Sequence, residues 1–169
     1  MQRKSSFPPV TDGGTRVLIL GSLPGEESLR QRQYYAHPQN RFWELVGEAI
    51  GADLRALAYE ARLAVLLTHH IGLWDVIADA HRSGSLDSAI RAERVNDLTA
   101  LARSLPRLRA IAFNGRKSAI AGRRQLAEIS GDIELIDLPS SSPAYAAMPI
   151  AEKISRWAVI GDIAANRGR

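Results

Sequence analysis

An apolar run opens into a glycine-proline loop at residues 16–25, which read RVLILGSLPG. Four aliphatic residues in succession, bounded by Gly21, are typical of a buried strand. The two glycines and the proline then fix a tight backbone path that lets other groups approach the main chain closely. No Gly-Lys-Ser/Thr follows, and no helix begins at a third glycine, so the loop is neither a P-loop nor a dinucleotide fingerprint. An ordinary strand-to-loop turn is the alternative interpretation.

Outward from this run, strands are expected to alternate with helices. Further strand candidates are 64–67, 110–113 and 133–138. Helices are predicted at 42–50, 54–62, 116–129 and 150–166, with a weak helical pattern at 74–80 and one or two amphipathic helices within 85–105. Such alternation, with little hairpin chemistry, predicts an α/β fold with a mostly parallel sheet that is covered on both faces.

Composition narrows the class of protein. The 169 residues are 46% hydrophobic and include no cysteine, which excludes disulfide scaffolds and thiolate metal sites. No apolar run reaches the ~18 residues that a membrane helix needs, and the start MQRKSS shows no secretion signal. We expect a cytoplasmic protein, a monomer without an obligate protein partner. Residues 1–14 are predicted to be a flexible lead-in, and residues 15–169 a single domain.

The basic residues are unevenly spread. Lys and Arg number 22 against 18 acids, a net charge of +4. No acid occurs between Leu98 and Ala127, a segment that holds Arg103, Arg107, Arg109, Arg116, Lys117, Arg123 and Arg124. Such a segment could follow a phosphate backbone, although a solvated face is an equal alternative.

Ligands of parallel α/β sheets bind beyond the carboxyl ends of the strands. Loops 21–40, 114–116 and 139–145 are expected there. The first of them contains YYAHPQNRFW at 34–43. Tyr34 and Tyr35 offer flat rings on which a base could stack. Asn40 directly precedes a helix, where an N-cap is the structural alternative. Core packing is expected for at least one of Phe42 and Trp43.

The other two loops carry hydroxyl and amide groups. Residues 139–145 read PSSSPAY, and hydroxyls on a short rigid loop suit phosphate oxygens, a serine-rich turn being the alternative. Asn114, in FNGRK at 113–117, could present a donor and an acceptor to a base edge. Its alternative is a β-to-α turn in which Asn-Gly supplies unusual dihedrals. No His stands with a partner at metal-ligand spacing, so no metal site is predicted.

Taken in order, GSLPG, YYAHPQNRFW, AFNG and LPSSSPAYA resemble the uracil-DNA glycosylase superfamily. The HPQNRFW part is similar to the mismatch-specific uracil/thymine branch. The GSLPG form, the serine-proline loop and WDV with GSLD at 84–87 look more like the hypoxanthine-DNA (DNA-deoxyinosine) glycosylase branch. This resemblance spans about residues 16–160. It implies a three-layer α/β/α domain with a central four-stranded sheet, no metal, no cofactor, and hydrolysis of the N-glycosidic bond of a deaminated base.

The resemblance also implies roles for single residues. Many superfamily members place Asp or Asn where this chain has Leu23, which cannot orient water and puts ordinary uracil excision in doubt. The important asparagine of the hypoxanthine branch matches Asn40, the expected catalytic residue. The expected base-binding residues are Gly21, Ser22, Leu23, Pro24, Gly25, Tyr35 and Asn114. The expected DNA-binding residues are Ser140, Ser141, Ser142, Pro143, Arg116 and Lys117, with Pro143 to Tyr145 near the gap that a flipped nucleotide leaves.

The leading hypothesis is therefore a DNA repair enzyme that flips hypoxanthine, or uracil, out of DNA and leaves an abasic site. One alternative is a mismatch-specific uracil/thymine glycosylase. Another is a damaged-DNA-binding module without catalysis, suggested by Leu23. A nucleotide hydrolase would need carboxylates for Mg²⁺, and Glu26-Glu27 is the only adjacent acidic pair in the polar loops. His37 and Asp75 are further candidates for holding water, each with a structural alternative.

Overall fold

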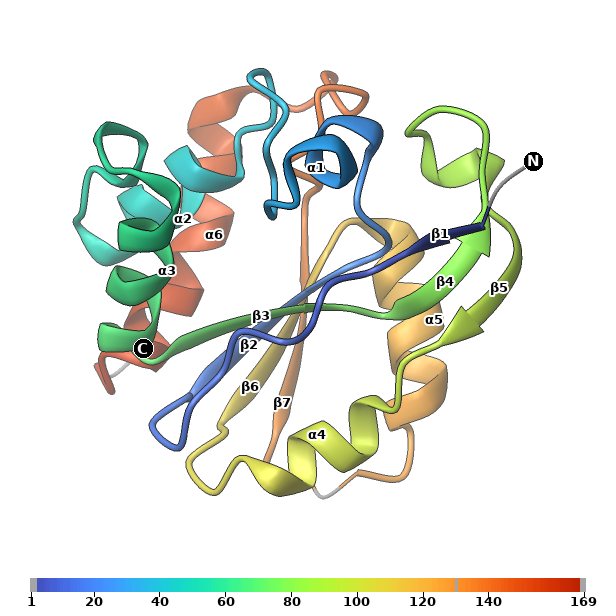
Figure 1. The fold of residues 1–169 in the computed structure, drawn as a ribbon. Coiled ribbons are helices and arrows are strands. Elements are labelled where there is room, and N and C mark those ends of the chain that lie inside the picture. The colour runs from blue at the N-terminus through green and yellow to red at the C-terminus, as the bar shows by residue number, and fades with distance from the viewer. Residues whose placement is uncertain (1–2, 130, 168–169) are drawn as a thin grey trace.

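A four-stranded parallel sheet forms the centre of the molecule in the computed structural model, which describes residues 3–129 and 131–167. Its strands are β2 (Val17–Gly21), β3 (Ile71–Asp75), β6 (Ala110–Asn114) and β7 (Glu134–Leu138), in the spatial order β3-β2-β6-β7. Register runs from Val17 opposite Ile71 and Ala110 to Gly21 opposite Asp75. All four strands therefore end at the same edge of the sheet (Figure 1).

Alternate residues of β2 face two different layers. Val17 and Ile19 belong to the core on one side, and Leu18 and Leu20 to the core on the other, because successive side chains of a strand point to opposite faces. Every residue of β2 is buried, as expected for a strand covered twice. The predicted three-layer α/β/α fold is confirmed.

Three helices cover one face: α2 (Phe42–Ile50), α3 (Tyr59–Thr68) and α6 (Ile150–Ala164). The other face is covered by α4 (Leu98–Ser104) and α5 (Arg116–Leu126), and the short α1 (Glu26–Gln31) lies at the end where the strands terminate (Figure 1). Short 3-10 turns occupy Leu54–Ala56 and Asp87–Ala89. Among the described residues, no helix is long and apolar enough to cross a membrane.

A second, three-stranded antiparallel sheet stands beside the first. It consists of β1 (Arg3–Ser5), β4 (Ile77–His81) and β5 (Arg91–Val95), in the order β1-β4-β5. The weak helix expected at 74–80 is therefore wrong, since this stretch ends β3 and forms most of β4. The helices expected within 85–105 are reduced to a 3-10 turn and α4.

The described part of the expected flexible lead-in is ordered. Residues 3–5 pair with β4, and Val10 bridges Leu73 of the central sheet. Backbone carbonyls of Phe7 and Pro8 accept hydrogen bonds from the Tyr34 hydroxyl, the one to Pro8 at 3.0 Å. The described residues of this segment therefore contact both sheets, while residues 1–2 lie outside the described residues.

The strand expected at 64–67 is also wrong. This apolar run lies inside α3, and the strand is the following β3. The helix expected over 54–62 is divided between a 3-10 turn and the start of α3. A short apolar run fits a buried helix segment as well as a strand, so only its tertiary partners decide between them.

Candidate active site

The loops after the four parallel strands enclose a cleft of about 720 Å³. Every residue that the sequence placed in the site lines it: residues 21–25, Tyr35, Asn40, Asn114, Arg116, Lys117 and residues 140–143. Asp75, at the end of β3, and residues 85–88 of the connection between β4 and β5 line it as well. The sequence therefore found three sides of the cleft and missed the side built by the small sheet.

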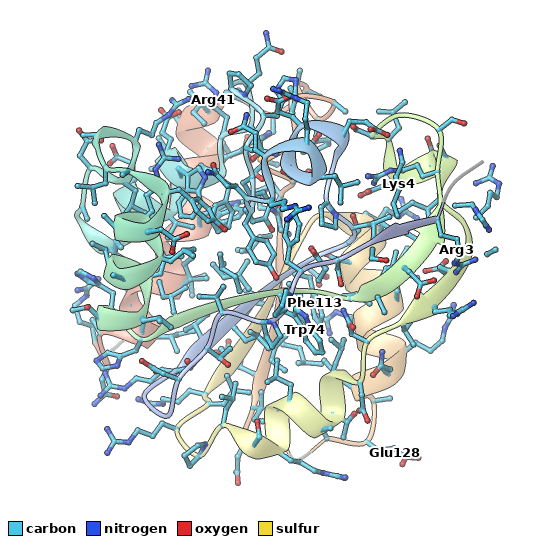
Figure 2. The ribbon with its side chains drawn as sticks, in the orientation of Figure 1. Arg3, Lys4, Arg41, Trp74, Phe113 and Glu128 are labelled. Atoms are coloured by element: carbon cyan, nitrogen blue, oxygen red, sulfur yellow. The ribbon has the colours of Figure 1, made fainter. Side chains whose placement is uncertain are left out.

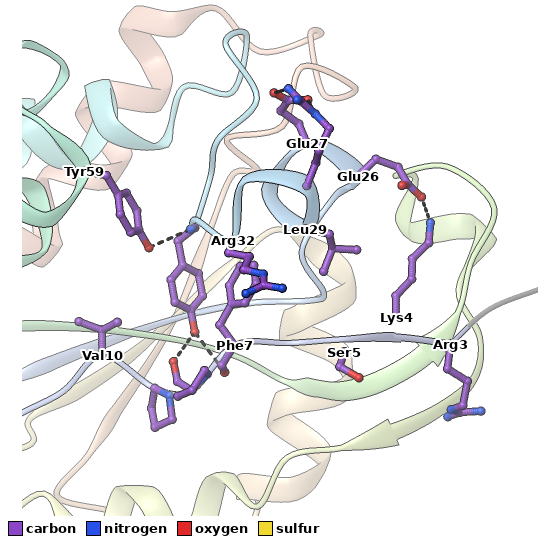
Figure 3. Close-up of a pocket in the computed structure, with 14 residues that line it drawn as sticks. Arg3, Lys4, Ser5, Phe7, Val10, Glu26, Glu27, Leu29, Arg32 and Tyr59 are labelled. Atoms are coloured by element: carbon purple, nitrogen blue, oxygen red, sulfur yellow. Dashed lines mark hydrogen bonds and ion pairs between the residues drawn. The ribbon is translucent and has the colours of Figure 1, made fainter.

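A second cavity, of about 970 Å³, lies between the N-terminal segment and α1 (Figure 3). Lys4 and Glu26 form an ion pair there, and the Tyr59 hydroxyl accepts a hydrogen bond from the backbone N–H of Tyr34. None of the expected catalytic, base-binding or DNA-binding residues lines this cavity, and Tyr34, which the sequence offered as a stacking ring, lines both cavities. We therefore place the active site in the smaller cleft at the strand ends.

Asn40 is held at the rim of the cleft by the start of α2. Its Oδ1 accepts a hydrogen bond of 3.0 Å from the backbone N–H of Phe42, and its own N–H donates to the carbonyl of His37 at 2.9 Å. In the described residues no hydrogen bond involves its Nδ2. The N-cap of α2 is Arg41, so the N-cap alternative for Asn40 does not hold, and its hydrogen bond to Phe42 closes the turn before the helix. This bond uses one acceptor site of the amide, and the side chain still lines the cleft.

The two neighbouring tyrosines behave differently. Tyr34 also borders the cleft, but its side chain is almost fully buried and its hydroxyl donates to the carbonyl of Pro8, so little of its ring is exposed to a base. Tyr35 lines the cleft and has a left-handed backbone (φ 54°). Phe42 stacks on one face of the Tyr35 ring at a centroid distance of 3.8 Å, which fixes the plane of the ring. Phe42 and Trp43 are both core residues, as expected for at least one of them.

Two buried polar groups meet at Gly21 on the floor of the cleft. A Cβ atom at Gly21 would lie 2.6 Å from Asp75 Oδ1 and 2.8 Å from the Tyr35 hydroxyl oxygen, so only glycine fits there. The close approach to the main chain is thus made by the protein's own side chains. Among the described residues, neither the Tyr35 hydroxyl nor Asp75 Oδ2 has a hydrogen-bond partner, although both are buried.

This environment changes the acidity of both groups. Burial, reinforced by the nearby Asp87 carboxylate and opposed by Arg82, raises the pKa of Asp75 to about 7. Burial beside Asp75 also raises the pKa of the Tyr35 hydroxyl, which stays protonated. At neutral or slightly acidic pH, the Tyr35 hydroxyl and a protonated Asp75 carboxyl can therefore act as two hydrogen-bond donors on the floor of the cleft.

Asn114 joins two loops. Its Oδ1 accepts a hydrogen bond from the backbone N–H of Ser141, and its Nδ2 donates to the Ser141 hydroxyl, both at 2.9 Å. The carbonyl of Ser141 accepts a further bond from the backbone N–H of Arg41, at 3.0 Å. This ties the loops after β6 and β7 to the start of α2, the segment that Arg41 marks in Figure 2. Gly115 has the positive φ of 94° expected of an Asn-Gly turn.

The serine loop is braced from within. Ser140 Oγ accepts a hydrogen bond from the backbone N–H of Ser142, and Ser142 Oγ accepts one from the backbone N–H of Ala144, so both N–H groups are engaged within the loop. Below the loop, the buried Lys153 donates to the carbonyls of Ser140 and Tyr145, each at 2.7 Å. Burial lowers the pKa of Lys153, with a further contribution from Arg41.

The first loop is braced from the other side, by the small sheet. Leu23 is buried against Ile77, Ala80 and Ile90, which is why it is apolar. The Ser22 hydroxyl donates to Asp87 Oδ1 at 2.6 Å. The guanidinium of Arg82, itself buried, donates to the carbonyl of Pro24. The small sheet therefore fixes the loop that follows β2.

The basic side chains of segment 98–127 do not form one continuous surface. Arg107 and Arg109 precede β6 and Arg116 follows it, so a strand of about 17 Å separates them. Lys117 is paired with Glu93 of β5 at 2.7 Å, and Arg123 with Asp137 at 3.0 Å. Arg116, exposed at the start of α5, has no ion pair among the described residues and lines the cleft. Only this end of the segment can meet a ligand there.

This arrangement has counterparts among known proteins. The model of the uracil DNA glycosylase superfamily matches residues 8–158. The chain belongs to that superfamily. The family expected from the four motifs is therefore confirmed.

Individual relatives are similar over most of their length. A protein of Methanosarcina acetivorans named hypoxanthine DNA glycosylase is 49% identical over 141 residues, covering 83% of this chain and 87% of that protein. One of Methanosarcina barkeri with the same name is 47% identical over 116 residues, covering 69% and 73%. The solution NMR structure of a candidate uracil DNA glycosylase from M. acetivorans superposes with a TM-score of 0.84 at 42% identity, covering 96% of this chain and 99% of that chain.

Proposed function

We propose that this protein is a monofunctional DNA glycosylase that removes hypoxanthine from DNA by hydrolysing its N-glycosidic bond. Membership of the uracil DNA glycosylase superfamily supports the reaction class. The names of two relatives at 49% and 47% identity support the base. The observation that carries the proposal is Asn40, which lines the same cleft as Tyr35 and Asp75 and whose Nδ2 has no hydrogen-bond partner among the described residues.

The reaction needs an extruded nucleotide, because the sugar C1′ of a stacked base cannot be reached. In the proposed complex the base enters the cleft against Tyr35, whose ring is held in plane by Phe42. The Asn40 amide holds the attacking water at the sugar, which uses proximity and orientation and needs no strong base. The C–N bond breaks toward an oxocarbenium-like sugar, and the electron pair leaves with the base. The water oxygen then bonds to C1′, and the proton that the water loses neutralises the departed base anion, which leaves an abasic sugar and the free base.

The leaving base carries negative charge that hydrogen-bond donors can stabilise. Within the described residues, the backbone N–H groups of Leu23 and Gly25 have no hydrogen-bond acceptor, and both residues line the cleft. The Tyr35 hydroxyl and a protonated Asp75 supply two further donors on the floor. Both polar ends of Asn114 are engaged by Ser141, so we assign Asn114 to positioning the loops instead of reading the base.

DNA contacts are proposed for the rim. Arg116 stands exposed at the N-terminus of the eleven-residue α5, where its charge and the helix dipole both favour phosphate. Ser140, Ser142 and Pro143 line the same rim, whereas the buried Ser141 hydroxyl holds Asn114. We therefore expect the serine loop to contact DNA through its outer surface.

One assay tests the proposal. Duplexes of one sequence, each with a single hypoxanthine, uracil, xanthine or G·T mismatch, are incubated with the protein and then treated with alkali, which cleaves abasic sites. We expect alkali-sensitive strands from the hypoxanthine duplex at the highest rate. An unmodified duplex is the control.

The other outcomes separate the alternatives. Faster release of uracil or mispaired thymine would assign the chain to a sister specificity. Tight binding of the lesion without alkali-sensitive sites would make it a damage-binding module. Either result would overturn the proposal, and neither depends on the role of any single residue.

A further inference from the structure

Exposed apolar side chains gather at the mouth of the cleft. Four large hydrophobic residues are exposed in the described part of the chain: Leu86 (57%), Val95 (50%), Ile120 (50%) and Tyr145 (41%). Leu86, Ile120 and Tyr145 line the cleft, and Val95 does not. Single exposed apolar residues are common, but three around one polar cleft mark a surface that meets a partner.

Leu86 is the most exposed of them and stands on a fixed turn. The Ser85 hydroxyl accepts a hydrogen bond of 2.8 Å from the backbone N–H of Glu26, and Asp87 Oδ1 accepts one of 2.6 Å from Ser22. The two neighbours of Leu86 are thus bonded to the start of α1 and to the loop after β2. A turn anchored on either side of its apex holds the leucine in one place and leaves its side chain in solvent.

The turn is also supported from below. Lys4 and Arg82 both donate to the carbonyl of Gly84, at 2.8 and 3.0 Å. Figure 1 shows this connection, between β4 and β5, at the same end of the molecule as the loops after β2 and β7. Leu86 therefore stands on the small-sheet side of the cleft, on a different element from the serine–proline loop and its Tyr145.

We propose that Leu86 is a DNA-inserting residue, whose side chain enters the base stack beside the extruded nucleotide. The inference rests on the proposed glycosylase function. Leucine is one of the apolar wedges that proteins place between base steps, and insertion removes its exposed surface from water. Arg91, which is exposed at the start of β5, lines the same rim and brings positive charge to the side of the cleft that carries the wedge.

The test compares double-stranded with single-stranded substrates that contain hypoxanthine. Because only a duplex has a stack to fill, Leu86→Ala is expected to slow single-turnover excision from duplex DNA about tenfold and to leave the single-stranded rate unchanged. Leu86→Met, which keeps an apolar side chain of similar size, is expected to restore the duplex rate. Val95→Ala is the matched control: an exposed aliphatic residue on the same small sheet but outside the cleft.

A second readout does not depend on excision. The fluorescence of 2-aminopurine placed next to the lesion rises when its stacking is lost, and we expect Leu86→Ala to lose most of that rise while Val95→Ala keeps it. An unchanged duplex rate with unchanged fluorescence would overturn the proposal, as would equal losses on both substrates. Absence of excision by the wild-type protein would instead count against the proposed function, and the fluorescence would still decide the role of Leu86.

Discussion

The two sheets of the molecule differ in burial and in what they support. Every residue of β2 and β6 in the central sheet is buried, whereas every residue of β5 in the small sheet is exposed. The central sheet holds the helices together and brings four strand ends to one edge. The small sheet stands at the side of that edge and fixes the loop after β2 through Leu23, Arg82 and Asp87. Stability and loop positioning are therefore carried by different parts of the chain.

The largest loss of stability is expected from a substitution in the central sheet. Ile19→Ala truncates a fully buried side chain in the core between β2 and the covering helices α2, α3 and α6. The cavity it leaves should lower the free energy of unfolding by about 2–5 kcal/mol. Urea denaturation followed by circular dichroism measures the loss. A change below about 1 kcal/mol would mean that the central sheet is not the main source of stability.

Asp75 lies where the two sheets meet, and its contribution to the free energy of unfolding depends on pH. Because its pKa is raised to about 7, the folded protein holds a proton that the unfolded chain releases at lower pH. This contribution to stability is complete below pH ~4 and is lost as the pH rises through ~7, a change of about 3 kcal/mol between pH 5 and pH 8. The charged groups that face Asp75 are Asp87 and Arg82, with Tyr34 and Tyr35 beside it.

The direction of this pH dependence is tested by measuring the free energy of unfolding of Asp75→Asn and of the wild type from pH 4 to pH 8. The side chain at position 75 of the variant is uncharged at every pH. The stability of the variant relative to the wild type should therefore be greatest at pH 8 and should decrease as the pH falls. Parallel pH profiles for the two proteins would show that Asp75 is ionised throughout and would remove it as a donor to the leaving base.

Arg82 tests the bracing role of the small sheet. Arg82→Met keeps the apolar stem and removes the hydrogen bonds to Pro24 and Gly84, which should cost about 1–3 kcal/mol. Excision should fall along with stability, because the loop after β2 lines the cleft. Single-turnover rates measured well below the melting temperature separate the two effects. Full activity in a destabilised variant would contradict the bracing role.

The smallest effect is expected at the outer strand of the small sheet. Val95→Ala shortens a half-exposed side chain at the end of β5, so stability should change by less than about 0.5 kcal/mol. The thermal midpoint, compared with that of Ile19→Ala, gives the contrast between the sheets directly. A loss comparable with that of Ile19→Ala would abolish the distinction between the two sheets.

The same contrast explains what could be predicted from the sequence. Strands β2 and β6 were found as short apolar runs, because a doubly covered strand needs apolar residues on both faces. The edge strand β7, ELIDL, was found from its apolar residues although it is only partly buried. The small sheet was missed because β5, RAERV, has three charged residues and no buried side chain, and because β4 pairs with segments far away in the sequence. The small sheet is defined by pairing between distant segments, and no local sequence pattern reveals such pairing.

The sequence predicted the site residues that belong to motifs at the ends of the strands. It did not predict residues whose role depends on a contact with a distant part of the chain. Asp75 was only a further candidate, because the end of β3 was expected to be helical. Lys153 could have been found: it falls between Ile150 and Trp157 on the inward stripe of the last helix, where a lysine is unusual. For Arg82 the sequence shows no such signal. Leu86 lies within the GSLD motif at 84–87, but its exposure depends on the turn between β4 and β5.

We propose above all that the Asn40 amide serves the chemistry in addition to bracing the turn before α2. Single-turnover excision by Asn40→Ala, on a duplex with one hypoxanthine, tests it most directly, with the exposed neighbour Gln39→Ala as the matched control. The account predicts a loss of about 10²–10³-fold in rate for Asn40→Ala, with unchanged affinity for the DNA and a normal rate for the control. A wild-type rate in Asn40→Ala would contradict it.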